Sequence, residues 1–262
     1  MLAIDIGTFL FAVLAVLVVR KRMKPGRRDD AGGSWTVDLR EGWRAIASRR
    51  GVALLIFMIS AVTFFLGFLQ TLIAPMVLSF ADARTLGAIQ SVSAVGMLAS
   101  SLLIGMISVG RRYAGILAVG LTVAGLAMAL MGLTTNTYAI IAGGFLFLSA
   151  LPFVNMSADV LVRRNIPNEK QGRVWGMVGV LSQLGFIAAY AIAGPLADHV
   201  FNPLLEEGGL LASSVGRLVG VGPERGIGFL FVIAGLLVVA MAAVTYGFRS
   251  IRALEKTAAN ST

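Results

Sequence analysis

Few side chains that could perform acid–base or nucleophilic chemistry lie within the long apolar stretches of this sequence. Asp5 and Asp159 are the only charged residues that we place inside such stretches, and each lies near an end. An acid within one turn of a membrane interface costs far less than the roughly 3 kcal/mol estimated at mid-bilayer. We therefore interpret both as boundary residues. The sequence also contains no HExxH, GxSxG or P-loop pattern, so its chemistry argues against an enzyme.

Metal and cofactor chemistry has equally few candidate residues. The chain has no Cys, which excludes disulfides, thiolate metal sites and Cys nucleophiles. Its one histidine, His199, is too few for a histidine metal cage. The net charge of +9 is dispersed among short segments and is not gathered on one soluble basic face. We predict no metal, no cofactor and no nucleic-acid partner.

Uncharged polar and aromatic side chains inside the apolar stretches are better candidates for binding. Hydrocarbon cannot satisfy an amide or a hydroxyl, so these groups must face other helices or a watery cavity. Interhelical hydrogen bonding is the plainer interpretation of each polar residue, and ordinary packing is the plainer one of each aromatic residue. The candidates for a substrate cavity are Phe64, Phe68, Gln70, Gln90, Ser93, Asn155, Gln183, Phe186 and Tyr190.

Glycines are abundant, and three of them have a spacing that favours close helix packing. Gly172, Gly176 and Gly179 recur every three or four residues, and the first two have the small-xxx-small spacing that lets two backbones approach. We expect this face to pack tightly against another helix or to slide along it. Prolines inside or at the ends of apolar stretches predict bends. These are Pro75, Pro152 and Pro195.

The elements that position these residues must be membrane-spanning helices. The 262 residues are 57% apolar and 13% charged, and the mean hydropathy is +0.86. Charge-free runs long enough to cross a bilayer occupy residues 51–81, 85–110, 113–158, 174–197 and 226–248, and TTNT at 134–137 divides the third run into two spans. Residues 2–19 have an acid first and RKRMK after, the reverse of a signal peptide, so we count them as a span. We predict an all-α, polytopic helical membrane protein with seven spans.

The distribution of Lys and Arg predicts the orientation of these spans. Alternate loops hold ten, two, four and three such residues, 19 of the 22 in the chain, whereas the loops between them hold one, none and two. Short loops rich in Lys and Arg stay on the cytoplasmic side. We therefore place the amino terminus outside and the carboxyl terminus inside.

This topology predicts four parts in the chain. Residues 1–19 form the first transmembrane helix, and residues 20–50 form a cytoplasmic linker. Leu39, Trp43 and Ile46 have helical spacing in that linker, which predicts an amphipathic helix on the membrane surface. Residues 51–250 form a six-helix transmembrane bundle with an outer loop at 198–225, in which we expect one or two short interfacial helices. Residues 251–262 form a cytoplasmic tail.

Five stretches, in order along the chain, resemble the major facilitator superfamily, and within it the drug:proton antiporters of macrolide-efflux type. They are IDIGTF at 4–9, LREGWRAIASRRG at 39–51, LGAIQSVSAVGMLASSLLIG at 86–105, IPNEKQGRVWG at 166–176 with GPLAD at 194–198, and GVGPERGIGFLF at 220–231. The resemblance covers nearly the whole chain. It implies that the first span corresponds to the last helix of the amino-terminal bundle of a two-bundle transporter. The other six spans then correspond to the complete carboxyl-terminal bundle.

The resemblance also implies a role for the charged turns. In the superfamily, the loop between the second and third helices of each bundle carries a Gly, acid and Arg pattern that holds the inner gate closed. The matching loop here is GMISVGRR at 105–112, which keeps Gly105, Arg111 and Arg112 but lacks the acid. For each single charge, exclusion from the membrane remains the plainer interpretation. The adjacent part of the gate would comprise Asp159, Arg163, Arg164, Glu169 and Arg173.

The function that the resemblance implies is export of hydrophobic or amphipathic compounds, such as macrolide-like drugs, across a bacterial cytoplasmic (inner) membrane. The partners it implies are membrane lipid, a hydrophobic small-molecule substrate, protons as a candidate coupling ion, and the missing amino-terminal bundle in cis or in trans. Alternating access requires one bundle to move against another around a midplane site. Three accounts of the chain stay open: a fragment of a complete exporter, one half of a split transporter, or a degenerate membrane domain with an interaction or structural role and no transport by itself.

Overall fold

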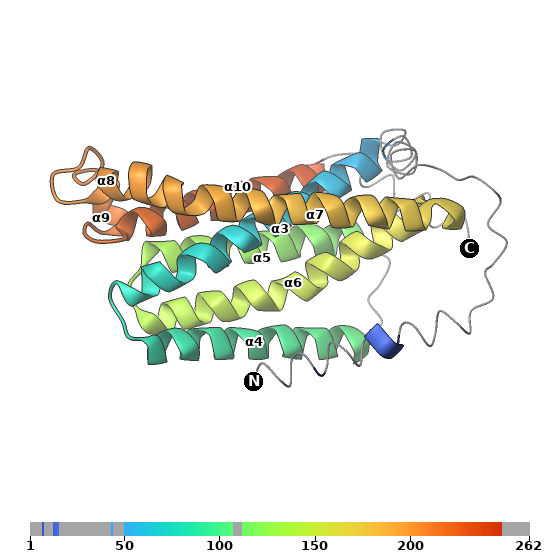
Figure 1. Ribbon diagram of the computed structural model, residues 1–262, viewed down its shortest axis with the longest axis horizontal. Helices are drawn as coiled ribbons and strands as arrows, with labels where there is room; N and C mark the ends of the chain where they lie inside the picture. Colours follow the sequence, from blue (N-terminus) through green and yellow to red (C-terminus); the bar gives the residue numbers. More distant parts are fainter. Residues whose placement is uncertain (1–6, 8–12, 16–42, 44–49, 107–111, 248–262) are drawn as a thin grey trace. The chain divides into compact units, whose positions relative to one another are not determined.

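The computed structural model describes residues 50–106 and 112–247, together with residues 7, 13–15 and 43 (Figure 1). The chain divides into two compact units, Met1–Asp38 and Leu39–Thr262, and the long helices that the structure describes belong to the second. Most of the first predicted span and most of the predicted linker, including nearly all of its amphipathic helix, lie outside the described residues. So does the predicted carboxyl-terminal tail.

Six long helices form most of the described part of the second unit. Each is long and apolar enough to cross a membrane, and the part of the chain that the structure describes contains no strand. The prediction of an all-helical membrane protein is thus confirmed. The helices are α3 (Arg50–Leu78), α4 (Ala83–Met106), α5 (Tyr113–Leu133), α6 (Thr137–Asn165), α7 (Asn168–Leu196) and α10 (Arg225–Gly247).

Polar side chains define where two of these helices begin. The Asn136 side chain caps α6 by accepting from the backbone N–H groups of Tyr138 and Ala139, at 2.9 and 3.4 Å. This cap explains why the long apolar run breaks at TTNT. Asp82 caps α4 in the same way and accepts from the backbone N–H of Thr85 at 2.8 Å. Hydrogen bonds from the side chain and backbone of Thr85 hold the pKa of Asp82 below its usual value.

The helix that contains the GPLAD stretch does not end at its charged residue. A π-helical turn, η1 (Ala197–Phe201), and a short helix, α8 (Asn202–Leu205), continue α7 without a break. The backbone N–H of Ala197 reaches both Ala193 and Gly194, two residues that lie beside Pro195. Asp198 and His199 are exposed, so their polar groups do not require the helix to stop. A second short helix, α9 (Gly216–Val219), lies between this segment and α10.

Each of the six long helices packs most extensively against one or two of the others. Contacts join α3 to α7, α4 to α6, α6 to α5, and α5 to α10, and Figure 1 shows these helices lying side by side. Helices α3 and α7 run in the same direction, because Ser60 contacts Leu181 and Gln70 contacts Tyr190. Two clusters of buried apolar side chains fill the interior, one around Met128, Ile140 and Phe231 and the other around Leu55, Leu121 and Leu161.

Paired glycines let α5 and α10 approach at the backbone. A Cβ atom placed on Gly125 would lie 2.5 Å from the carbonyl oxygen of Gly235, and one placed on Gly228 would lie 2.6 Å from that of Gly132. The two pairs are one heptad apart on antiparallel helices. Neither helix can therefore carry a side chain at these positions without moving its neighbour.

The glycine face predicted on α7 is open in this bundle. Gly172, Gly176 and Gly179 are exposed, and no described atom lies within 4 Å of a Cβ placed on any of them. Close packing of this face therefore stays a prediction, and it requires a partner outside the described bundle. Other glycines do make close contacts between the described helices, among them Gly185 of α7, where a Cβ atom would lie 2.8 Å from the carbonyl oxygen of Ser60 on α3.

We expect Gly235→Leu to destabilise the bundle by about 1–3 kcal/mol, because its new side chain would meet the backbone of α5. Gly176→Leu is the matched control, since its side chain enters open space and should change stability by no more than about 0.5 kcal/mol. The apparent unfolding midpoint of each purified variant in detergent measures the difference. Equal destabilisation by the two changes would contradict the assigned α5–α10 interface.

Candidate substrate cavity and gate

A polar and aromatic contact joins α3 to α7 at one end of their interface. The Tyr190 hydroxyl donates to Gln70 Oε1 at 3.3 Å, and the rings of Tyr190 and Phe186 stack with their centroids 5.8 Å apart. Gly67 makes room for Phe186, because a Cβ atom at Gly67 would lie 2.8 Å from that ring. The structure thus brings three of the predicted cavity residues together on two neighbouring helices.

The two phenylalanines predicted on α3 have different surroundings. Their rings stack with a centroid distance of 5.9 Å, but Phe68 is buried in the core whereas Phe64 is only partly buried. Phe64 also lines an apolar groove of about 560 Å³ between α3 and α10. The burial of Phe68 fits the packing interpretation, whereas the position of Phe64 beside the groove is compatible with the predicted role in binding.

Ser93 lies in the contact between α4 and α6. Its side chain is buried, its hydroxyl donates to the carbonyl oxygen of Ile89 at 2.7 Å, and it occupies the space that a Cβ on Gly144 would need. This hydrogen bond lies within one helix. The geometry fits the packing interpretation of Ser93 better than the cavity interpretation.

The remaining candidates carry exposed amides on three different helices. Gln90 on α4, Asn155 on α6 and Gln183 on α7 are all exposed, and each lies within a helix long enough to span the membrane. Gln183 is three residues before Phe186 and seven before Tyr190, so these three side chains share one face of α7. The structure gives no contact that brings Gln90 or Asn155 to that face.

Of the six described spans, helices α4 and α7 have the smallest fraction of buried residues and the lowest hydropathy. In its most apolar window, α4 buries 22% of its residues and α7 buries 17%, compared with 61% for α5. The same two helices have the lowest mean hydropathy of the six. If lipid covered both open faces, the most exposed helices should be the most apolar, because hydrocarbon cannot satisfy polar groups. The lower hydropathy of α4 and α7 favours contact of their open faces with protein or water over contact with lipid.

The predicted gate arginines contact aromatic rings. The guanidinium carbon of Arg163 lies 5.4 Å from the centroid of the Trp175 ring, and that of Arg164 lies 4.9 Å from the centroid of Tyr113. Both distances permit cation–π attraction. Because Tyr113 begins α5 and Trp175 lies in the second turn of α7, the two arginines at the end of α6 link three helices at one end of the bundle.

The turn between α6 and α7 is closed by an amide side chain. Gln171 Nε2 donates to the carbonyl oxygens of Arg163 and Ile166, each at 3.3 Å, and to Asn168 Oδ1 at 3.0 Å. Glu169 is an acid in the first turn of α7, where it complements the helix dipole. These contacts give the charged turn a defined geometry.

The other gate candidates lie along α6 and α7 and at the ends of α4 and α5. Asp159 is partly buried one turn before Arg163 on α6, and Arg173 is exposed on α7. Gly105 near the end of α4 has open space where a Cβ would lie. Arg112 immediately precedes α5 and is exposed, and Arg111 lies outside the described residues.

Sequence reasoning missed the aromatic and amide partners in this region. Tyr113, Trp175 and Gln171 stand beside the basic residues in the sequence, but none was predicted to belong to the gate. Each ring contacts an arginine of another helix and not the basic residue beside it in the sequence, so no local spacing indicates these contacts.

Comparison with known proteins supports the resemblance to the major facilitator superfamily and does not distinguish a type within it. The family model of the Major Facilitator Superfamily matches residues 2–190, well over half of the chain. The match includes α3 to α6 and most of α7. A comparison with curated proteins gives no match.

We expect the contact between Arg164 and Tyr113 to contribute about 0.5–1 kcal/mol of coupling energy. A double-mutant cycle with Arg164→Gln and Tyr113→Leu, read from unfolding midpoints in detergent, measures it. The same cycle with Arg164→Gln and Trp175→Leu is the control, because Trp175 contacts the other arginine. Equal coupling in both cycles, or none with Tyr113, would contradict the assignment.

Proposed function

Because the chain belongs to the Major Facilitator Superfamily, a family of membrane transporters, we propose that it forms one half of the pathway of an exporter. The proposed substrates are hydrophobic or amphipathic compounds, with macrolide-like drugs as the class that the sequence resemblance implies. The proposed site lies between this bundle and a second one, which further residues of the same polypeptide or another chain would supply.

The main support for this proposal is that α4 and α7 combine the smallest buried fractions with the lowest hydropathy of the six described spans. A second bundle packed on these helices would bury their open faces, including the glycines of α7, and would leave a pathway between the two bundles. Exposed amides would then face this pathway. A purely lipid-facing role for Gln90 and Gln183 would leave their amides unsatisfied in hydrocarbon.

The side chains available to the pathway suit amphipathic solutes. The face of α7 that carries Gln183, Phe186 and Tyr190 offers one amide, one apolar ring and one phenol, and Gln70 adds a second amide. Rings can contact an apolar surface while amides and hydroxyls bond to polar substituents, the usual composition of a small-molecule site. None of these four side chains carries a formal charge, which favours substrates that are recognised by shape and hydrogen bonding.

Proton coupling needs a carboxylate at mid-depth. The carboxylates within the described spans, Asp159, Glu169 and Asp198, all lie nearer to helix ends. We propose protons as the coupling ion on the sequence resemblance alone, and we therefore assign the mid-depth carboxylate to the second bundle. The charged turn between α6 and α7 would contribute to the inner gate, with its arginines exchanging aromatic contacts for other partners as the bundles move.

We propose a bacterial cytoplasmic (inner) membrane as the location, with the amino terminus outside and the carboxyl terminus inside. The helix ends that carry Arg112, Arg163 and Arg164 would then face the cytoplasm. A single cysteine introduced at Thr135 should react with an impermeant maleimide added to intact cells, and one at Lys170 should react only after permeabilisation. Identical labelling of both positions in intact cells would contradict this topology.

Efflux should depend on the exposed amides of the proposed pathway. We expect Gln183→Leu and Gln90→Leu to lower transport of an amphipathic dye by several-fold, because each removes a polar contact within the pathway. The measurement is dye accumulation in cells that make the chain together with its native upstream and neighbouring genes. Ser214→Leu is the control, since this exposed hydroxyl lies between α8 and α9, outside the spans, and donates to the carbonyl oxygen of Leu211.

Two results would overturn the proposal in different ways. Unchanged efflux in both amide variants would exclude these residues from the pathway. If deletion of the chain left dye accumulation unaltered and the purified chain stayed monomeric, the alternative of an interaction or structural domain without transport would be favoured.

A further inference from the structure

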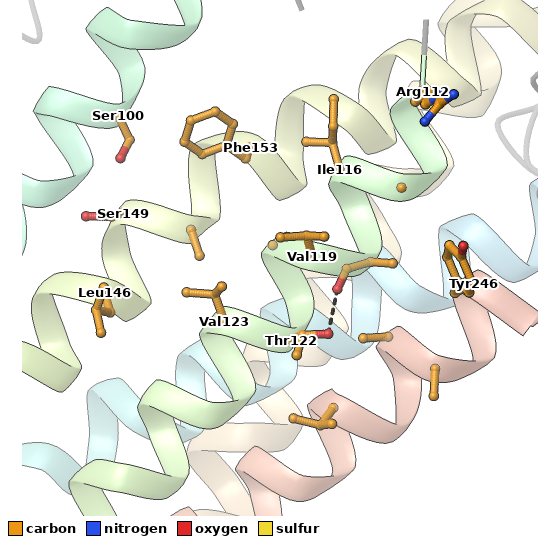
Figure 2. Close-up of a pocket in the computed structure, with 17 residues that line it drawn as sticks. Ser100, Arg112, Ile116, Val119, Thr122, Val123, Leu146, Ser149, Phe153 and Tyr246 are labelled. Carbon is orange, nitrogen blue, oxygen red and sulfur yellow. Dashed lines mark hydrogen bonds between the residues drawn. The ribbon is translucent and has the colours of Figure 1, made fainter. Parts of the chain in front are cut away.

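A long apolar groove runs along α5, away from the candidate pathway. It has a volume of about 870 Å³ and is lined by residues of α5 and α6, by Ser100 of α4 and by the last turns of α10 (Figure 2). Among the described residues, none from α3 or α7 lines it, and none of the nine predicted cavity residues does. The groove is therefore a feature separate from the face of α7 discussed above.

The lining of the groove changes in character along its length. Small and apolar residues such as Gly115, Val119 and Ala242 form most of it, and Val119 is 65% exposed. Arg112 lies at one end, where α5 begins, and Tyr246 lies on α10 near the same end (Figure 2). The groove is thus mostly apolar, with the hydroxyl residues Ser100, Thr122 and Ser149 also in its lining and a cation and a phenol at one end.

The length of the groove corresponds to one leaflet of a bilayer. Its lining on α5 extends from Arg112 to Val123, roughly 16 Å at 1.5 Å per residue. Half of a hydrocarbon core of roughly 30 Å is about 15 Å. With α5 crossing the membrane, the cation would lie at headgroup level and the apolar part would reach to about the bilayer centre.

We propose that this groove binds an anionic phospholipid, with an acyl chain lying along α5 and the phosphate paired with Arg112. A guanidinium recognises phosphate through strong, charge-assisted hydrogen bonds, and basic pockets between spans bind anionic headgroups. A zwitterionic lipid brings its own cation beside the phosphate, so it should bind more weakly. The exposure of Val119 leaves the groove open at the side to lipid in the surrounding leaflet.

Native mass spectrometry of the full chain, purified in mild detergent and mixed with equal amounts of phosphatidylglycerol and phosphatidylcholine, tests the proposal. The wild-type chain should retain phosphatidylglycerol in preference. Arg112→Gln should weaken that binding about fivefold, the equivalent of about 1 kcal/mol for one surface cation. Lys170→Gln is the charge control, because Lys170 is exposed on the first turn of α7, at the proposed cytoplasmic end, and does not line the groove.

A second variant tests the apolar part of the groove. Gly115→Leu should also lower phosphatidylglycerol binding, because a Cβ at Gly115 meets nothing within 4 Å and the larger side chain would occupy the groove without a clash. Gly87→Leu, at an equally open glycine on α4 that does not line the groove, should leave binding unchanged. Circular dichroism confirms that each variant keeps its helices.

Several outcomes would overturn the proposal. Equal retention of the two lipids, or equal losses in Arg112→Gln and Lys170→Gln, would indicate only diffuse attraction to the membrane surface. Unchanged binding in Gly115→Leu would place the lipid elsewhere. A photoreactive residue at Val119 that cross-links to protein and not to lipid would assign the groove to a protein partner. None of these measurements requires transport, so they stand or fail independently of the proposed exporter function.

Discussion

Hydrocarbon offers no hydrogen-bond partner, and this constraint determines most of what the chain does structurally. Every backbone group in a span must be satisfied within the protein, so the described spans are helices. Hydroxyls follow the same rule: Thr71, Ser93 and Thr122 each donate to the carbonyl four residues earlier in their own helix. An amide such as that of Gln183 has two donors and an acceptor, so one hydrogen bond to a carbonyl of its own helix leaves its other polar groups unsatisfied. Their exposure is therefore the feature that most needs a functional explanation.

The spans were predictable because they depend on composition alone. Six of the seven predicted spans lie in the described part of the chain, and the division of the long run at TTNT follows from a cap that Asn136 could form in isolation. The end of α7 was not predictable in the same way. A charged residue marks where a helix can reach water, but it does not force the helix to end, and α7 continues past Asp198 through a π-helical turn.

Contacts between helices were harder to predict, because they depend on which faces meet. Spacing alone favoured Gly172, Gly176 and Gly179, yet a Cβ atom on any of these three would meet no described atom. The glycine pairs at which α5 and α10 meet, Gly125 with Gly235 and Gly132 with Gly228, are seven residues apart on each helix. A small-residue motif indicates that a backbone can approach, but it does not identify the partner. The cavity residues divided likewise: Gln70, Phe186 and Tyr190 meet, whereas Ser93 packs within the bundle. The aromatic partners of the arginines depended on the path of three separate helices and had no periodic signal.

The continuous helix formed by α7, η1 and α8 has 38 residues, Asn168–Leu205, or roughly 57 Å at 1.5 Å per residue. A hydrocarbon core of roughly 30 Å cannot contain it, so it must tilt or project well into the aqueous phase. The carboxyl-terminal end of this long helix contacts the start of α10. Gly226 lies against the backbone of Phe201 and Asn202, and Asn202 Nδ2 donates to the Glu224 carboxylate at 2.9 Å. Because of these contacts, a change in the tilt of the long helix would also move the start of α10. Bilayers of different thickness would favour different tilts of the long helix, and hence different positions of the start of α10.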